Sequence, residues 1–172
     1  MKTKTNLILV GMSGAGKSTL GVLLAKALGK HFTDTDIIIQ QKTGKLLQQI
    51  IDTEGVDAFL KTEEEIVSSL ELSDHVIATG GSVVYSDRAM EKLKQNGTVV
   101  YLDLPYEEIV SRLSNITTRG IVFKSHNDLR AVYEERLPLY RRYADLTVHP
   151  AGHGIEASVE EIIKHLTEET RS

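Results

Sequence analysis

Apolar residues along this chain form short continuous runs, and these alternate with longer segments in which apolar residues recur every three or four positions. The short runs have the length of β-strands and lie at 6–10, 31–33, 75–78, 98–102 and 146–148. The longer segments predict helices at 17–28, 37–41, 46–52, 56–70, 87–94, 106–113, 127–144 and 157–167. Strands and helices that alternate through short connections favour a parallel sheet covered on both faces. We therefore expect a three-layer α/β/α fold with a five-stranded parallel sheet.

No linker or repeat interrupts this pattern, and 172 residues suit one domain over 1–172. The absence of cysteine excludes disulfides, thiolate zinc sites and a cysteine nucleophile. A net charge of -4 and few aromatic residues argue against a nucleic-acid surface. No apolar run approaches the length of a membrane span, and the N-terminal run is too short for a signal peptide. We expect a cytoplasmic monomer without nucleic-acid or membrane partners.

Residues 11–18 form a complete G-x-x-x-x-G-K-S phosphate loop between a predicted strand and a predicted helix. Glycines allow successive backbone N–H groups to curl around a polyphosphate, and the helix N-terminus favours the anion. Lys17 is expected to reach the β- and γ-phosphates and Ser18 to bind Mg²⁺. The residues expected to contact the nucleotide are Gly11, Gly14, Ala15, Gly16, Lys17, Ser18 and Thr19. The loop therefore predicts binding of a nucleoside triphosphate, the alternative being a glycine-rich turn without a ligand.

Two further groups of residues follow predicted strands. Asp34 and Asp36 end the second strand, and in an extended segment residues two apart point to the same side. Both carboxylates are then expected in the crevice at the carboxyl ends of the strands, the alternative being that Asp36 caps the next helix. Gly80 and Gly81 follow the third strand, where a ligand can approach the backbone closely or where the chain simply turns.

The segment 114–126 has weak periodicity and contains Arg119. A connection of this length in a compact domain is usually functional or disordered. An arginine in a loop near a phosphate loop suggests a mobile lid that closes over the nucleotide, the alternative being a mobile surface loop without a role in the site.

Taken together, these residues resemble the shikimate kinase family, a member of the nucleoside-monophosphate-kinase-like P-loop group. The resemblance covers nearly the whole chain, and the order and spacing of its elements agree. The elements are the phosphate loop, F-x-D-x-D at 32–36, F-x-x-x-E at 59–63, A-T-G-G at 78–81, V-V-Y-L-D-L-P at 99–105, the lid arginine Arg119 and Y-E-E-R-L-P-L-Y at 133–140.

The resemblance implies transfer of the γ-phosphoryl group of ATP to the 3-hydroxyl of shikimate, a small hydroxylated acid, with Mg²⁺ as cofactor, in aromatic amino acid (chorismate) biosynthesis. The residues that it implies for catalysis are Lys17, Asp36 and Arg119. For the acceptor it implies Asp36, Glu63, Gly80, Gly81 and Arg136, with Arg136 pairing with the acceptor carboxylate. For Mg²⁺ it implies Ser18 and Asp34, and for adenine it implies Arg112 and Pro150.

Leu60 departs from the family pattern, which has a second carboxylate-binding arginine after Phe59. Ser82 departs from it too, at the third glycine of the family, where variation is expected to be tolerated. The loss of one charge-assisted partner leaves open a related enzyme that phosphorylates another polyol or hydroxy acid, such as a gluconate-like compound. A nucleotide-binding regulatory protein that has lost catalysis and a nucleoside monophosphate kinase are further alternatives.

Overall fold

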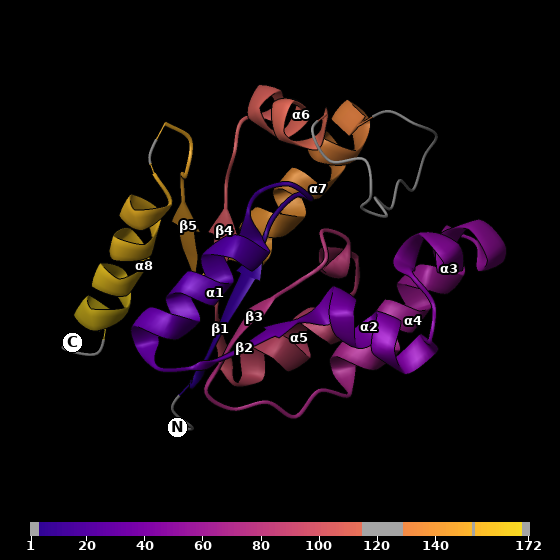
Figure 1. The fold of residues 1–172 in the computed structure, drawn as a ribbon, viewed down its shortest axis with the longest axis horizontal. Helices are drawn as coiled ribbons and strands as arrows, with labels where there is room; N and C mark the ends of the chain where they lie inside the picture. The colour runs from indigo at the N-terminus through magenta and orange to yellow at the C-terminus, as the bar shows by residue number, and fades with distance from the viewer. Residues whose placement is uncertain (1–3, 115–128, 153, 170–172) are drawn as a thin grey trace.

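Five parallel strands form one sheet in the order β2-β3-β1-β4-β5 (Figure 1). The computed structural model describes residues 4–114, 129–152 and 154–169. The strands are β1 (Asn6–Val10), β2 (His31–Asp34), β3 (His75–Ala78), β4 (Gly97–Leu102) and β5 (Leu146–Val148). The expected five-stranded parallel sheet is confirmed, and each predicted strand agrees with an observed one to within a residue at either end.

Helices cover both faces of the sheet. They are α1 (Lys17–Leu28), α2 (Thr35–Thr43), α3 (Leu47–Glu54), α4 (Val56–Ser68), α5 (Asp87–Gln95), α6 (Tyr106–Ser114), α7 (Leu129–Tyr143) and α8 (Ile155–Glu169), with a short 3₁₀ helix, η1 (Val83–Tyr85). Helices α1 and α8 lie together on one face, while α5 and α7 pack on the other (Figure 1). The expected three layers are therefore present. No helix of the described part of the chain is long and apolar enough to cross a membrane.

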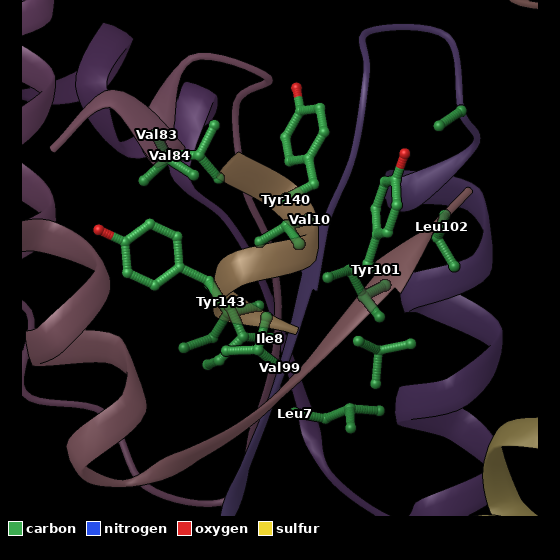
Figure 2. Close-up of a cluster of buried hydrophobic side chains, with 14 of the residues drawn as sticks. Leu7, Ile8, Val10, Val83, Val84, Val99, Tyr101, Leu102, Tyr140 and Tyr143 are labelled. Atoms are coloured by element: carbon green, nitrogen blue, oxygen red, sulfur yellow. The ribbon is translucent and has the colours of Figure 1, made fainter. Parts of the chain in front are cut away.

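The main core lies between these layers. All five residues of β1 are buried, as expected for a central parallel strand with helices on both faces. Tyr101 from β4 and Tyr140 from α7 stack with their ring centroids 5.1 Å apart, and Figure 2 shows both rings beside Val10. This stacking fixes α7 against the sheet and thereby places the side chains of α7 near the phosphate loop.

A second, smaller core joins α2, α3 and α4, which lie together at one side of the sheet (Figure 1). Its buried members are Ile39, Leu47, Ile50 and Phe59, with Leu60 packed against them. These three helices form a unit that borders the carboxyl ends of the strands but has its own apolar centre.

One local expectation is wrong. The predicted helix 37–41 begins earlier, at Thr35, so Asp36 stands in the first turn of α2 and not on an extended strand. The cause is Asp34, whose Oδ1 accepts a hydrogen bond of 2.9 Å from the Asp36 backbone N–H and so caps the helix. Asp34, and not Asp36, is therefore the capping residue. The predicted lid beyond Ser114, including Arg119, lies outside the described residues.

Candidate active site

The phosphate loop connects β1 to α1, and its glycines have the backbone conformation that such a loop requires. Gly16 immediately precedes α1 with a φ of 91°, in the left-handed region that favours glycine. Because α1 begins at Lys17, the first N–H groups of the helix are directed into the loop. The predicted strand–loop–helix setting for a bound polyphosphate is present.

Lys17 is buried at 7% exposure and lies folded over the loop. Its Nζ donates hydrogen bonds of 2.7 Å to the carbonyl oxygens of Gly11 and Met12. A buried ammonium held in this way is positioned at the mouth of the loop, where the outer phosphates of a nucleotide would lie.

Ser18 and Asp34 face each other across the start of α1 and the end of β2. The Ser18 Oγ donates a 2.7 Å hydrogen bond to Asp34 Oδ2. A hydroxyl and a carboxylate beside a phosphate loop are the hard oxygen ligands that Mg²⁺ takes. The donor chemistry of this pair therefore fits a magnesium ion.

A cavity of about 290 Å³ joins these groups to the residues expected for the acceptor. Its lining includes Ser13, Gly14 and Gly16–Ser18 of the phosphate loop, both carboxylates Asp34 and Asp36, and the backbone of Gly80 and Gly81. Residues that are far apart in the sequence therefore meet at the carboxyl ends of the parallel strands, as this class of sheet predicts.

Two carboxyl groups lie beside Gly80 at the acceptor end: Asp36, which lines the cavity, and the buried Glu63 behind it. A Cβ atom on Gly80 would lie 2.8 Å from both Asp36 Oδ1 and Glu63 Oε2, so a larger residue would require both carboxyl groups to move. Glu63 is fully buried, and its Oε1 accepts a 2.7 Å hydrogen bond from Ser82 Oγ. Burial raises the pKa of Glu63 to about 7, the Ser82 hydrogen bond opposes this rise, Asp36 adds to it and Arg136 opposes it.

Arg136 supplies a buried positive charge next to this end, in a small adjoining pocket that it lines together with Gly80, Gly81 and Ser82. It is 1% exposed, and its Nη1 lies 2.9 Å from where a Cβ on Gly81 would stand. The Nε donates a 3.2 Å hydrogen bond to the hydroxyl of Tyr85, and the guanidinium lies over the Tyr85 ring. Tyr140 donates a 2.6 Å hydrogen bond to the carbonyl of Gly81, which fixes the glycine loop against the same helix.

A second cavity, of about 230 Å³, lies on the other side of the phosphate loop. Arg112 and Pro150, the residues implied for adenine, both line it together with Thr19. The guanidinium of Arg112 donates a 3.3 Å hydrogen bond to the carbonyl of Ala15 and pairs with Glu108. The two implied residues are thus brought together next to the loop, with an apolar wall from Ile155 of α8.

Leu60 takes no part in either cavity. It packs against the small core of α2, α3 and α4 and does not line the described wall of the 290 Å³ cavity. Its side chain packs instead into the apolar cluster around Phe59.

Three residues that support the site were not among those predicted for it. Ser82 was expected to be a neutral replacement, yet its hydroxyl holds the buried carboxyl of Glu63. Tyr85 orients Arg136, and Thr35 accepts a 3.2 Å hydrogen bond from the Gly80 N–H. An unusual polar residue next to the glycine pair was the only available hint, and it concerns Ser82 alone.

The fold and the cavity together define a P-loop phosphotransferase that acts on a small molecule. A family model described as shikimate kinase matches residues 13–167. The shikimate kinase of Francisella tularensis subsp. holarctica is 39% identical over 99% of this chain and 98% of its own length. That of Thiobacillus denitrificans is 39% identical over 90% of this chain and 86% of its own.

Solved structures agree with these matches. Shikimate kinase from Acinetobacter baumannii in complex with shikimate superposes with a TM-score of 0.84 at 32% identity, covering 98% of this chain and 96% of that one. Shikimate kinase from Aquifex aeolicus gives a TM-score of 0.80 at 30% identity, covering 96% and 98%. The chain belongs to the shikimate kinase family and is an ATP-dependent kinase.

Proposed function

We propose that this protein transfers the γ-phosphoryl group of ATP to the 3-hydroxyl of shikimate. The observation that carries the proposal is the single cavity of about 290 Å³, in which the phosphate loop and the pair Gly80–Gly81 share one space. The relative from Acinetobacter baumannii, solved with shikimate, supports the choice of acceptor. Phosphoryl transfer needs mainly positioning and charge neutralisation, which a preformed cavity of this kind supplies.

At the donor end, Lys17 would hold the β- and γ-phosphates, and the loop amides would bind the remaining phosphate oxygens. Ser18 and Asp34 would hold Mg²⁺, which supplies charge neutralisation on the phosphate oxygens. Arg112 and Pro150 would lie against adenine in the neighbouring cavity. A role for Arg119 in stabilising the transferred group stays a prediction, since that residue lies outside the described ones.

At the acceptor end, Asp36 would bind the hydroxyls of the acceptor and accept the proton of the attacking one. The backbone of Gly80 and Gly81 would contact the ring, and Arg136 would pair with its carboxylate. The hydrogen bond from Arg136 to Tyr85 holds the guanidinium in place before the acceptor arrives, which lowers the cost of ordering it.

An acceptor screen tests this proposal. ADP release is measured with MgATP alone, with shikimate, and with a panel of other small hydroxy acids and polyols that includes gluconate. The expected result is release that depends on shikimate and is highest with it. No acceptor-dependent release with any compound would contradict kinase activity and would favour a regulatory nucleotide-binding protein.

Leu60 favours a second candidate, an acceptor that carries no anion at the point where the family has its second arginine. The substitution Leu60→Arg distinguishes the two. One charge-assisted hydrogen bond is worth about 1.5–3 kcal/mol, so shikimate affinity is expected to rise about 10–150-fold if shikimate is the acceptor. Leu60→Met, which keeps the apolar packing, is the matched control. An unchanged shikimate KM in Leu60→Arg, with faster turnover of another acid, would favour the second candidate.

A further inference from the structure

The buried carboxyl group of Glu63 has one oxygen bonded to Ser82 and the other beside the backbone of Gly80. Ser82 occupies Oε1, whereas Oε2 is fully buried and has no hydrogen-bond partner among the described residues. Oε2 lies 2.8 Å from where a Cβ on Gly80 would stand, the same point that Asp36 Oδ1 faces at 2.8 Å. A buried carboxylate oxygen without a partner is costly, which makes a proton on it favourable.

The polar and charged groups around Glu63 come from three different parts of the fold. Asp36 faces it from α2, Arg136 and Tyr140 face it from α7, and Ser82 faces it from the loop before η1. Ionisable residues elsewhere on α4, and on the α3 and α5 helices packed against it, are exposed or bonded to other groups: Asp52, Glu54, Asp57, Lys61, Glu64, Glu65, Asp87, Arg88, Glu91, Lys92 and Lys94. Arg136 is therefore the buried cation that offsets the two carboxyl groups, Asp36 and Glu63.

We propose that Glu63 takes up a proton from solvent when the acceptor binds, so that this side chain determines how acceptor affinity depends on pH. The proposal rests on the proposed function, because it requires an acceptor that carries a carboxylate.

The physical reason is competition for Arg136. Without acceptor, the positive charge of Arg136 lowers the pKa of Glu63 and partly compensates its burial. An acceptor carboxylate that pairs with Arg136 removes this compensation and adds a third negative charge beside Asp36 and the buried Glu63. Ionised Glu63, Asp36 and the acceptor would then place three negative charges around one guanidinium. A proton that forms an O–H bond on Oε2 of Glu63 removes one of them, and it returns to solvent when the product leaves.

Asp36 is the less favourable site for this proton. Its side chain is only partly buried and lines the open cavity, whereas Glu63 is 2% exposed. Leu60 reinforces the assignment, because it precedes Glu63 by one helical turn and places no cation near it. Water can stabilise the charge on Asp36 and does not reach that on Glu63.

The kinetic test measures the acceptor KM for shikimate between pH 6 and 9 at saturating MgATP. Since the pKa of Glu63 in the free enzyme is raised to about 7, KM is expected to rise about tenfold for each pH unit above that value. The effect is expected on KM and not on kcat, because acceptor-bound enzyme already holds the proton. In Glu63→Gln, which is neutral at every pH and still bonds Ser82, KM is expected to stay low and independent of pH. Glu65→Gln, an exposed neighbour on α4, is the matched control and is expected to follow the wild type.

Calorimetry on the unaltered protein gives a second test that does not depend on a variant folding. Binding of shikimate at pH 8, measured in two buffers with different heats of ionisation, is expected to show uptake of close to one proton. In Leu60→Arg the uptake is expected to fall, because a guanidinium one turn from Glu63 stabilises its ionised form. Zero proton uptake by the wild type, or a Glu63→Gln variant whose KM rises with pH as in the wild type, would overturn the proposal.

These outcomes separate this inference from the proposed function. Turnover of shikimate at pH 6.5 with a KM that does not change up to pH 9 would refute the role of Glu63 alone. No turnover of shikimate at any pH would refute the proposed function, and the proton uptake would fail with it.

Discussion

Asp34 both caps α2 and holds the proposed magnesium site, and two substitutions, Asp34→Asn and Asp34→Ala, distinguish these roles. Its Oδ1 caps α2 by accepting the Asp36 N–H at 2.9 Å, and its Oδ2 accepts the Ser18 hydroxyl at 2.7 Å in the proposed magnesium site. Asp34→Asn keeps an oxygen for the cap but removes the charge, whereas Asp34→Ala removes both. The first substitution is therefore expected to impair metal binding with little loss of stability, and the second to impair both.

The magnitudes follow from these contacts. Replacing an N-cap by alanine costs about 1 kcal/mol, whereas asparagine caps as well as aspartate. Asparagine loses only the charge at the helix N-terminus, about 0.3–1 kcal/mol. Asp34→Ala is therefore expected to melt about 2–4 °C below Asp34→Asn, as about 1 kcal/mol implies for a chain of this size. Both variants are expected to need about 10–100-fold more Mg²⁺ for half-maximal turnover, the usual cost of disturbing a residue that holds a metal site together.

Thermal unfolding by circular dichroism and Mg²⁺ titration of ADP release measure the two effects. Ser86→Ala, which removes the cap of α5 far from the phosphate loop, serves as a control that lowers stability without altering the Mg²⁺ requirement. The reasoning is refuted if Asp34→Asn and Asp34→Ala melt together, since the side-chain cap then contributes nothing. It is also refuted if Asp34→Asn keeps the Mg²⁺ dependence of the wild type.

Three other predictions concern catalysis, packing and acid stability. Lys17→Met fills the same buried space without the charge, so kcat in the ADP-release assay is expected to fall about 10²–10³-fold with the fold intact; a fall of less than tenfold would argue against its role. Gly97→Ala would place a Cβ 2.6 Å from Ile8 Cδ1, so urea unfolding is expected to show a loss of about 1–3 kcal/mol, and adding Ile8→Val should recover part of it if overlap is the cause. Partial burial raises the pKa of Asp145, but hydrogen bonds from Lys94 and the Val99 N–H outweigh this and lower it below 3.8. The ionised group therefore stabilises the fold above pH 3.8, and this contribution is lost as the pH falls through the lower, folded-state pKa. Asp145→Asn is expected to flatten the acid side of the unfolding curve, and an unchanged curve would contradict the assignment.

Most of the fold follows from patterns that involve neighbouring residues. The five apolar runs became the five strands because each is long enough for one strand and is bounded by polar or turn residues. The start of α2 differed because the Asp34 side chain accepts a hydrogen bond from the Asp36 backbone N–H and so begins the helix earlier. Pro138 lies inside α7 without ending it, which agrees with the predicted helix 127–144 over the part that the structure describes.

The sequence by itself determined the donor half of the site. A phosphate loop binds phosphate through consecutive backbone N–H groups and two adjacent side chains, here Lys17 and Ser18. All the groups that it needs therefore lie within the eight residues 11–18. The crevice that gathers Asp36 and Gly80 also followed from sequence, because all parallel strands end at the same edge of the sheet.

Only the tertiary structure decided the electrostatics of the acceptor half. Burial depends on residues that pack together from distant parts of the chain, and no local pattern reports it. Glu63 gains its buried environment from α2, α7 and the loop at Ser82, and Arg136 owes its orientation to Tyr85. In the sequence, Leu60 stands where the family has an acceptor-binding arginine, but in the structure its side chain packs against the small apolar core. The strength of a charge inside a protein is set by the water excluded around it, and that exclusion exists only once the helices have packed.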